Sequence, residues 1–77
     1  MVHFLLVYER SRGVLRRMER FEEADNLAAL DARFAEEALH AANEDVEVVV
    51  ISGESFEAIR QSHSRYFMTA REILASY

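Results

Sequence analysis

The chain of 77 residues contains no cysteine, no proline and no lysine, and it has only two glycines. Without cysteine it forms no disulfide and offers no thiolate to a metal, and this composition suits a reducing, cytoplasmic location. With so few chain-breaking residues, long irregular loops are not expected. No apolar run approaches the roughly 18 residues of a membrane span, and the run 4–8 lacks the basic flank of a signal peptide. The sequence therefore predicts no membrane association.

A chain of this length is expected to form one domain, residues 1–77. Its hydrophobic core supplies only a few kcal/mol of net stability, and small domains often add disulfides, a metal or a partner subunit. Because disulfides are excluded, association with a partner subunit is the source of additional stability that the composition leaves open.

Charge is segregated along the chain. Residues 9–20 hold five arginines and two glutamates, whereas residues 22–47 hold nine acidic residues and one arginine. The overall net charge of −5 therefore hides a basic segment followed by an acidic one.

Three segments have the composition of β-strands. The first, HFLLVYER, is apolar on both alternating faces, which is typical of a central strand. Gly13 provides the turn of a hairpin, and VLRRMERF forms the return strand, whose arginines suit an exposed edge. The third strand, VEVVVIS, is rich in β-branched residues and ends at Gly53.

Two segments have helical periodicity. In residues 22–42 an apolar stripe recurs at three- and four-residue steps, and we expect it to pack on the sheet. Its members are Leu27, Leu30, Phe34, Ala38 and Ala41. Ser55 is a suitable N-cap for a second helix, which is expected to run some twenty residues. Residues 68–77 are interpreted as a helical tail extension.

The predicted fold is α+β with the order ββαβα: a three-stranded, mainly antiparallel sheet of order 2-1-3, packed with two helices. If both helices cover one face, the other face is bare, and an apolar face of that size favours a two-fold homodimer. The alternative is that the helices cover opposite faces and complete the monomer. The predicted dimer interface comprises Leu5, Val7, Val49, Ile51, Tyr66, Ile73, Leu74 and Tyr77. If the faces are inverted, Leu6, Val48 and Val50 replace the strand residues.

Several pieces of the chain carry a resemblance to a known group of sequences. They are FLLVYER at 4–10, Gly13, the alanine-rich acidic segment, VEVVVI at 46–51 and SFEAI…HSRYF within 55–67. Together they resemble short proteins encoded in actinobacterial and actinophage genomes, for which no activity is established. The resemblance implies the ββαβα fold and leaves function open.

The segment QSHSRYF combines residue types that occur in catalytic sites, but its spacing does not favour catalysis. Ser62 and Ser64 point about 100° away from His63 on a helix, so no Ser–His dyad forms. Ile59 and Phe67 place His63 on the packing stripe of that helix, so it is interpreted as a structural residue. The three histidines lack the spacing of metal ligands, and the paired carboxylates are interpreted as solvated. We therefore expect no enzyme activity, no metal and no cofactor.

The arginine-rich hairpin 10–20 is the strongest charged candidate surface. Three interpretations remain: its arginines pair with acids of the same chain, they contact an acidic protein partner, or they bind nucleic acid. The last ranks lowest because the acidic helix repels a polyanion. The residues assigned to partner binding are Arg12, Arg16, Arg17 and Arg20.

The favoured hypothesis is a small self-associating protein-interaction module without catalytic activity. The first alternative is a nucleic-acid-binding regulator that uses the arginine hairpin. The second is a ligand-binding protein or enzyme with a pocket near His63.

Overall fold

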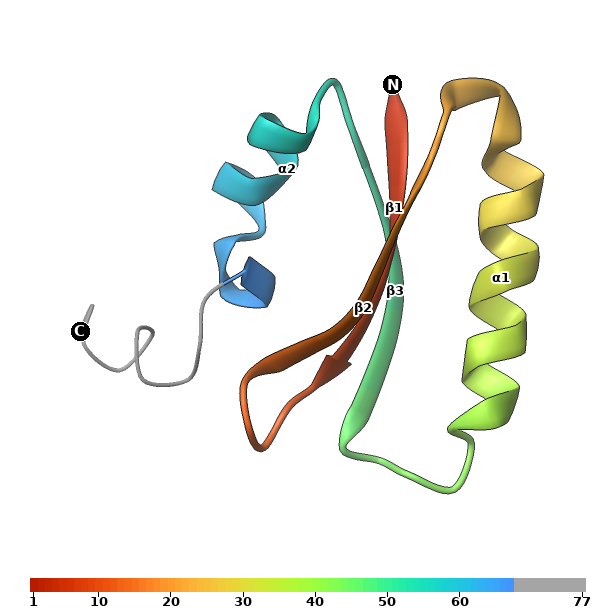
Figure 1. Cartoon of the computed structure of the whole chain (residues 1–77), viewed down its shortest axis with the longest axis vertical. Helices are drawn as coiled ribbons and strands as arrows, with labels where there is room; N and C mark the ends of the chain where they lie inside the picture. Colours follow the sequence, from red (N-terminus) through yellow and green to blue (C-terminus); the bar gives the residue numbers. More distant parts are fainter. Residues whose placement is uncertain (68–77) are drawn as a thin grey trace.

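The computed structural model describes residues 1–67, and the helical tail predicted at 68–77 lies outside the described residues, as do Ile73, Leu74 and Tyr77. Within this range no helix is long and apolar enough to cross a membrane. The elements follow one another in the predicted ββαβα order (Figure 1). They are β1 (Val2–Glu9), β2 (Val14–Phe21), the 3-10 turn η1 (Glu23–Asp25), α1 (Asn26–Leu39), β3 (Val46–Gly53), α2 (Phe56–Ser62) and the 3-10 turn η2 (Ser64–Phe67).

The three strands form one antiparallel sheet of order β2-β1-β3, which confirms the predicted fold class and strand order. The central strand is β1, the segment that is apolar on both faces. Gly13 has a φ of 63°, so the hairpin turn uses the left-handed conformation that glycine tolerates. A register shift between Val7 and Tyr8 marks an irregularity in the β1–β2 pairing.

The pairing register decides which side chains share a face, because directly opposite residues point to the same side of a sheet. Leu5 lies opposite Val50 and Val7 opposite Val48, whereas Leu6 lies opposite Val49 and Phe4 opposite Ile51. The strand residues predicted for the dimer interface therefore do not form one surface. Leu5 and Val7 lie on one face of the sheet, and Val49 and Ile51 lie on the other.

The two helices cover opposite faces of the sheet, as Figure 1 shows with the sheet between α1 and α2. The expectation that both helices share one face, leaving a bare apolar face, is wrong. The physical reason lies in β1, where Leu5 and Leu6 point to opposite sides and both have 0% exposure. A strand that is apolar on both faces requires cover on both. Leu5 and Val7 are accordingly buried within the single chain.

The larger core lies between the sheet and the C-terminal segment. Phe4, Leu6 and Tyr8 of β1 pack there with Ile59 of α2 and Tyr66 of η2. Aromatic contacts join the layers: the Tyr8 and Tyr66 rings meet edge to face with centroids 5.1 Å apart.

The last helix is shorter than predicted. Ser55 caps α2 as expected, since its side chain accepts a hydrogen bond from the N–H of Ala58 at 3.2 Å. The helix then ends at Ser62, and His63 has φ −125° and ψ 42°. The break lets the following 3-10 turn direct Tyr66 inward, where it is 6% exposed.

The described chain is a thin plate with Cα extents of 38 × 32 × 12 Å. Figure 1 is viewed down the shortest axis, so the strands lie behind one another and the helices flank them. Because strands lie about 4.8 Å apart, three of them account for most of the shortest dimension. Each outer strand therefore runs along one broad surface of the plate.

Candidate interaction surface

The face that α1 turns toward the sheet is small and partly polar. Ala29 is 1% exposed and is the buried residue of the helix. One and two turns further along, Ala32 and Glu36 are partly buried. Glu36 forms an ion pair with Arg17 of β2 and lies 3.3 Å from the Nε2 of His40. Alanines allow α1 to approach the sheet closely, while an ion pair replaces the apolar contact at its far end.

The predicted packing stripe of α1 points away from the sheet. We call Leu27, Leu30, Phe34, Ala38 and Ala41 the α1 stripe, and all five residues are exposed. Leu27 is 70% and Phe34 62% exposed. Since a helix advances about 100° per residue, Leu27 lies about 200° from Ala29, on the opposite side of the helix. The prediction that this stripe packs on the sheet is therefore wrong, and within residues 1–67 nothing covers its apolar surface.

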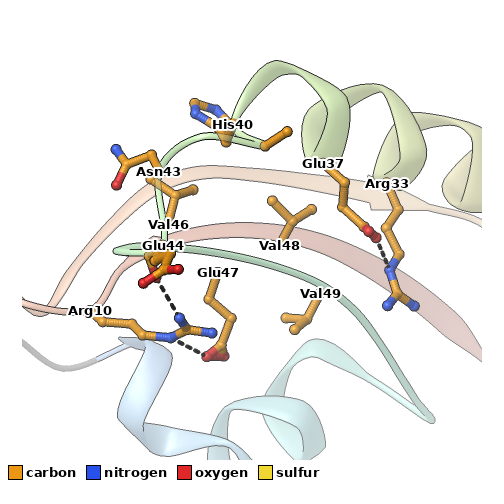
Figure 2. A pocket seen from close by; sticks show the side chains of 11 residues that line it. Arg10, Arg33, Glu37, His40, Asn43, Glu44, Val46, Glu47, Val48 and Val49 are labelled. Carbon is orange, nitrogen blue, oxygen red and sulfur yellow. Dashed lines mark hydrogen bonds and ion pairs between the residues drawn. The ribbon is translucent and has the colours of Figure 1, made fainter.

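A groove of about 510 Å³ runs between α1 and the outer edge of β3. Figure 2 shows Arg33 and Glu37 on the α1 side, joined by an ion pair of 2.6 Å, with Val48 and Val49 of β3 on the other. Successive residues of a strand point to opposite faces, so a groove lined by both valines follows the strand edge itself. Its polar lining carries both signs of charge.

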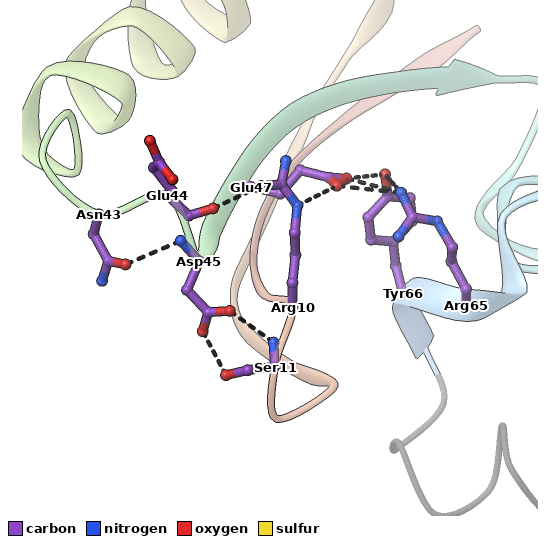
Figure 3. A network of polar contacts seen from close by, with 8 residues as sticks. All are labelled: Arg10, Ser11, Asn43, Glu44, Asp45, Glu47, Arg65 and Tyr66. Atoms are coloured by element: carbon purple, nitrogen blue, oxygen red, sulfur yellow. Dashed lines mark hydrogen bonds and ion pairs between the residues drawn. The ribbon is translucent and has the colours of Figure 1, made fainter.

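A polar network joins the β1–β2 turn, the start of β3 and the C-terminal turn (Figure 3). At its centre is Glu47, whose carboxylate accepts hydrogen bonds from the Tyr66 hydroxyl, from Arg10 at 3.3 Å and from Arg65 at 2.9 Å. Arg10 also donates to the carbonyl of Glu44 at 2.7 Å. These contacts join segments up to 37 residues apart, so the network holds the N-terminal end of β3 in place.

The network shifts the protonation of two of its members. Burial raises the pKa of the Glu47 carboxyl, but hydrogen bonds from Tyr66 and Arg10 and the charges of Arg65 and Arg10 outweigh it, so the pKa lies below the ordinary value. For Tyr66, burial and the hydrogen bond to Glu47 raise the pKa above the usual value. Both groups therefore keep their hydrogen-bonded forms, a carboxylate and a neutral phenol, near neutral pH.

The four arginines predicted to bind a partner do not form one patch. Arg17 is opposite Val7, on the α1 side, and pairs with Glu36 and Glu19; Arg20 is opposite Phe4, on the other side. Their cross-strand partners thus place them on different faces. Arg20 lies 3.1 Å from Glu22, and Arg12 lies 3.7 Å from Glu9. Within residues 1–67, Arg16 alone of the four has no ion pair within 4 Å. Arg12, Arg17 and Arg20 thus pair with acidic residues of the same chain, which is the first of the three interpretations of the hairpin.

Three further features that bear on the alternative functions can be located in the described part of the chain. Phe4 and Tyr8 are the aromatic residues of the strand next to the arginine hairpin, and both are buried in the core, so neither is open to stack on a base. His63 is exposed at the end of α2, so its assignment to the packing stripe is wrong, and it does not line the groove. Within residues 1–67 no three potential ligands among His, Asp and Glu gather to hold a metal.

The residues that define this surface do not stand out in the sequence. Glu37 is one of the paired carboxylates interpreted as solvated, no motif points to Arg33, and the β3 segment is interpreted through its two faces and not through its edge. The exposed edge was detectable in principle, because order 2-1-3 leaves the third strand at an edge and VEVVVIS carries no proline and no basic residue.

Comparisons of the chain with protein-family models, with curated proteins and with solved structures give no match.

Proposed function

We propose that the chain is a protein-interaction module that associates with itself and has no catalytic role. The observation that supports this most directly is the orientation of α1, which turns Ala29 inward and the α1 stripe outward. A sequence places a regular apolar stripe on a helix when that stripe is to be buried. Since the described residues of the chain do not bury it, a second protein surface is the cover that the pattern favours.

Small size supports the same proposal. Among residues 1–67 ten apolar residues are buried, shared between the two faces of a three-stranded sheet. A core of this extent gives little net stability, and natural domains of this length commonly gain more from a partner subunit.

The proposal is tested by light scattering over a wide concentration range. We expect a species of twice the 8.9 kDa chain mass, whose fraction increases with concentration. A species that stays at 8.9 kDa at high concentration contradicts the proposal.

The α1 stripe offers a matched pair of variants for this measurement. Phe34→Ser removes a stripe residue and is expected to weaken association at least tenfold, since burial of one large apolar side chain is worth about 1.5–3 kcal/mol. The control is Leu39→Ser, at a residue that is 75% exposed but lies about 100° or more from the stripe residues Leu27 and Phe34. Equal effects of the two substitutions, or none from either, argue against the stripe as the contact.

A further inference from the structure

The two edges of the sheet differ in their protection against pairing with another strand. The β2 edge has a register irregularity and carries arginines, two devices that discourage edge-to-edge contact. The β3 edge has the sequence VEVVVISG. It pairs with β1 without a register shift from Val46 to Gly53, and it contains a single charged residue. That residue, Glu47, is occupied by the network with Arg10 and Tyr66. The unprotected edge is therefore β3.

The backbone groups that β3 offers to a partner follow from its pairing with β1. The N–H of Arg10 donates to the carbonyl of Asp45 at 2.8 Å, which extends the β1–β3 ladder by one hydrogen-bonded pair. Hydrogen-bonded and non-bonded pairs alternate along an antiparallel ladder. Glu47 and Val49 consequently direct their N–H and C=O groups to β1, while Val48, Val50 and Ser52 direct theirs away from the sheet. These outward groups form a regular row along the edge.

The shape of the chain leaves this row of backbone N–H and C=O groups accessible to a partner. Because the plate is 12 Å thick, the β3 edge lies along one of its two broad surfaces, with α1 on one side of it and α2 on the other. The groove between β3 and α1 follows this edge. Leu30 and Phe34 are seven and three residues before the groove-lining Glu37, so they lie on the same side of the helix. The α1 stripe is thus continuous with the edge.

The occupant that matches this surface is a second copy of the chain. The outward residues Val48 and Val50 are identical in type, so a β3 strand that runs antiparallel to itself about a two-fold axis pairs valine with valine. An axis perpendicular to the sheet keeps both α1 helices on the same face and brings their groove sides together. Because the two α1 helices are then antiparallel, Arg33 of one copy faces Glu37 of the other, and opposite charges meet.

The available area is adequate for such a contact. A stable dimer of standard size buries about 800 Å² of each partner. The chain exposes 5244 Å², and its broad surface measures 38 × 32 Å between Cα atoms. The broad surface that carries the strand edge and the groove is therefore larger than the area that such a contact needs.

We infer that two copies join through antiparallel pairing of their β3 edges into one continuous sheet, with the two α1 helices adjacent on one face. This inference rests on the proposed self-association and specifies its geometry. It pairs the row of outward backbone groups and covers the part of the α1 stripe that lies on the groove side, Leu30 and Phe34.

The absence of cysteine makes the geometry directly testable. Val48→Cys, Val49→Cys and Val50→Cys each introduce a single thiol near the proposed axis, where opposite Cα atoms lie about 4.5–5.5 Å apart, a separation suitable for a disulfide. Under mild oxidation in dilute solution we expect at least one of these full-length variants to become a covalent dimer. The control is Met18→Cys, an exposed position on the β2 edge, which should form no covalent dimer under the same conditions.

Hydrogen exchange on the unaltered chain provides a second readout that no substitution disturbs. The amides of Val48 and Val50 should exchange more slowly as the concentration increases, whereas exposed amides of β2 should not change. A dimer by light scattering with no β3 disulfide and no added protection at Val48 and Val50 overturns the β3 geometry and leaves the proposed function standing. A chain that stays monomeric overturns both.

Discussion

The hydroxyl of Tyr66 donates a hydrogen bond to the carboxylate of Glu47, 19 residues earlier in the chain. This bond joins η2 to the N-terminal end of β3 (Figure 3), and the Tyr66 ring also packs edge to face against Tyr8 of β1. The proposed interface begins at this strand, so the contact supports the surface that a partner would meet.

Tyr66→Phe removes this hydrogen bond and keeps the aromatic packing. We expect a loss in the free energy of unfolding of about 1.5 kcal/mol, the low end for a hydrogen bond to a charged group, because Arg10 and Arg65 still contact the carboxylate. Urea denaturation at neutral pH measures it. In a Glu47→Gln background the same substitution should cost less, since the charged acceptor is gone. Equal costs in both backgrounds would show that the two side chains are not coupled.

Stability should decrease at acidic pH in a way that depends on Glu47. Its folded-state pKa is lowered, so its contribution is present above the ordinary glutamate pKa of the unfolded chain and is lost as the pH falls through the lower folded value. Urea midpoints measured from neutral to acidic pH should decrease across that interval. The decrease should be smaller in Glu47→Gln, which does not titrate there. A pH profile unchanged by Glu47→Gln would refute the assignment.

Gly53→Ala tests the close approach of β3 and α2. A Cβ built at Gly53 lies 2.7 Å from Cγ1 of Ile59, a side chain that is buried in the core. Overpacking of this kind costs about 1–3 kcal/mol. The decisive comparison is with Ile59→Ala, which removes the clashing atom: Gly53→Ala should cost less in that background than alone. Additive costs would place the origin of the effect elsewhere, in the backbone of the strand.

Local features of the fold were predictable from the sequence because their causes are local. The strand 4–8, the left-handed turn at Gly13 and the cap at Ser55 each follow from residue type and nearest neighbours. Strand order also followed, since the segment that is apolar on both faces belongs in the centre.

Features that depend on distant contacts were not predictable in the same way. The register of β1 with β3 decides whether Leu5 shares a face with Val49 or with Val50, and a shift of one residue reverses the assignment. The helix break at His63 leads to the contact of Tyr66 with Glu47, which local spacing does not reveal. An apolar stripe indicates that one side of α1 is to be buried, but it does not indicate whether the sheet or another chain buries it.

Ala29 provides the sharpest test of how α1 is turned. It is 1% exposed against the sheet, so Ala29→Leu forces three further carbon atoms into a closed contact and should destabilise the chain by about 1–3 kcal/mol. Ala35→Leu makes the same chemical change at an exposed position of the same helix and should alter stability by no more than about 0.5 kcal/mol. Both are measured by urea denaturation at low concentration, where association contributes least. If the helix were instead rotated to place the α1 stripe on the sheet, Ala29 would face solvent and Ala29→Leu would be tolerated as well as Ala35→Leu. A large cost at Ala29 alone therefore supports the orientation on which the proposed interface depends.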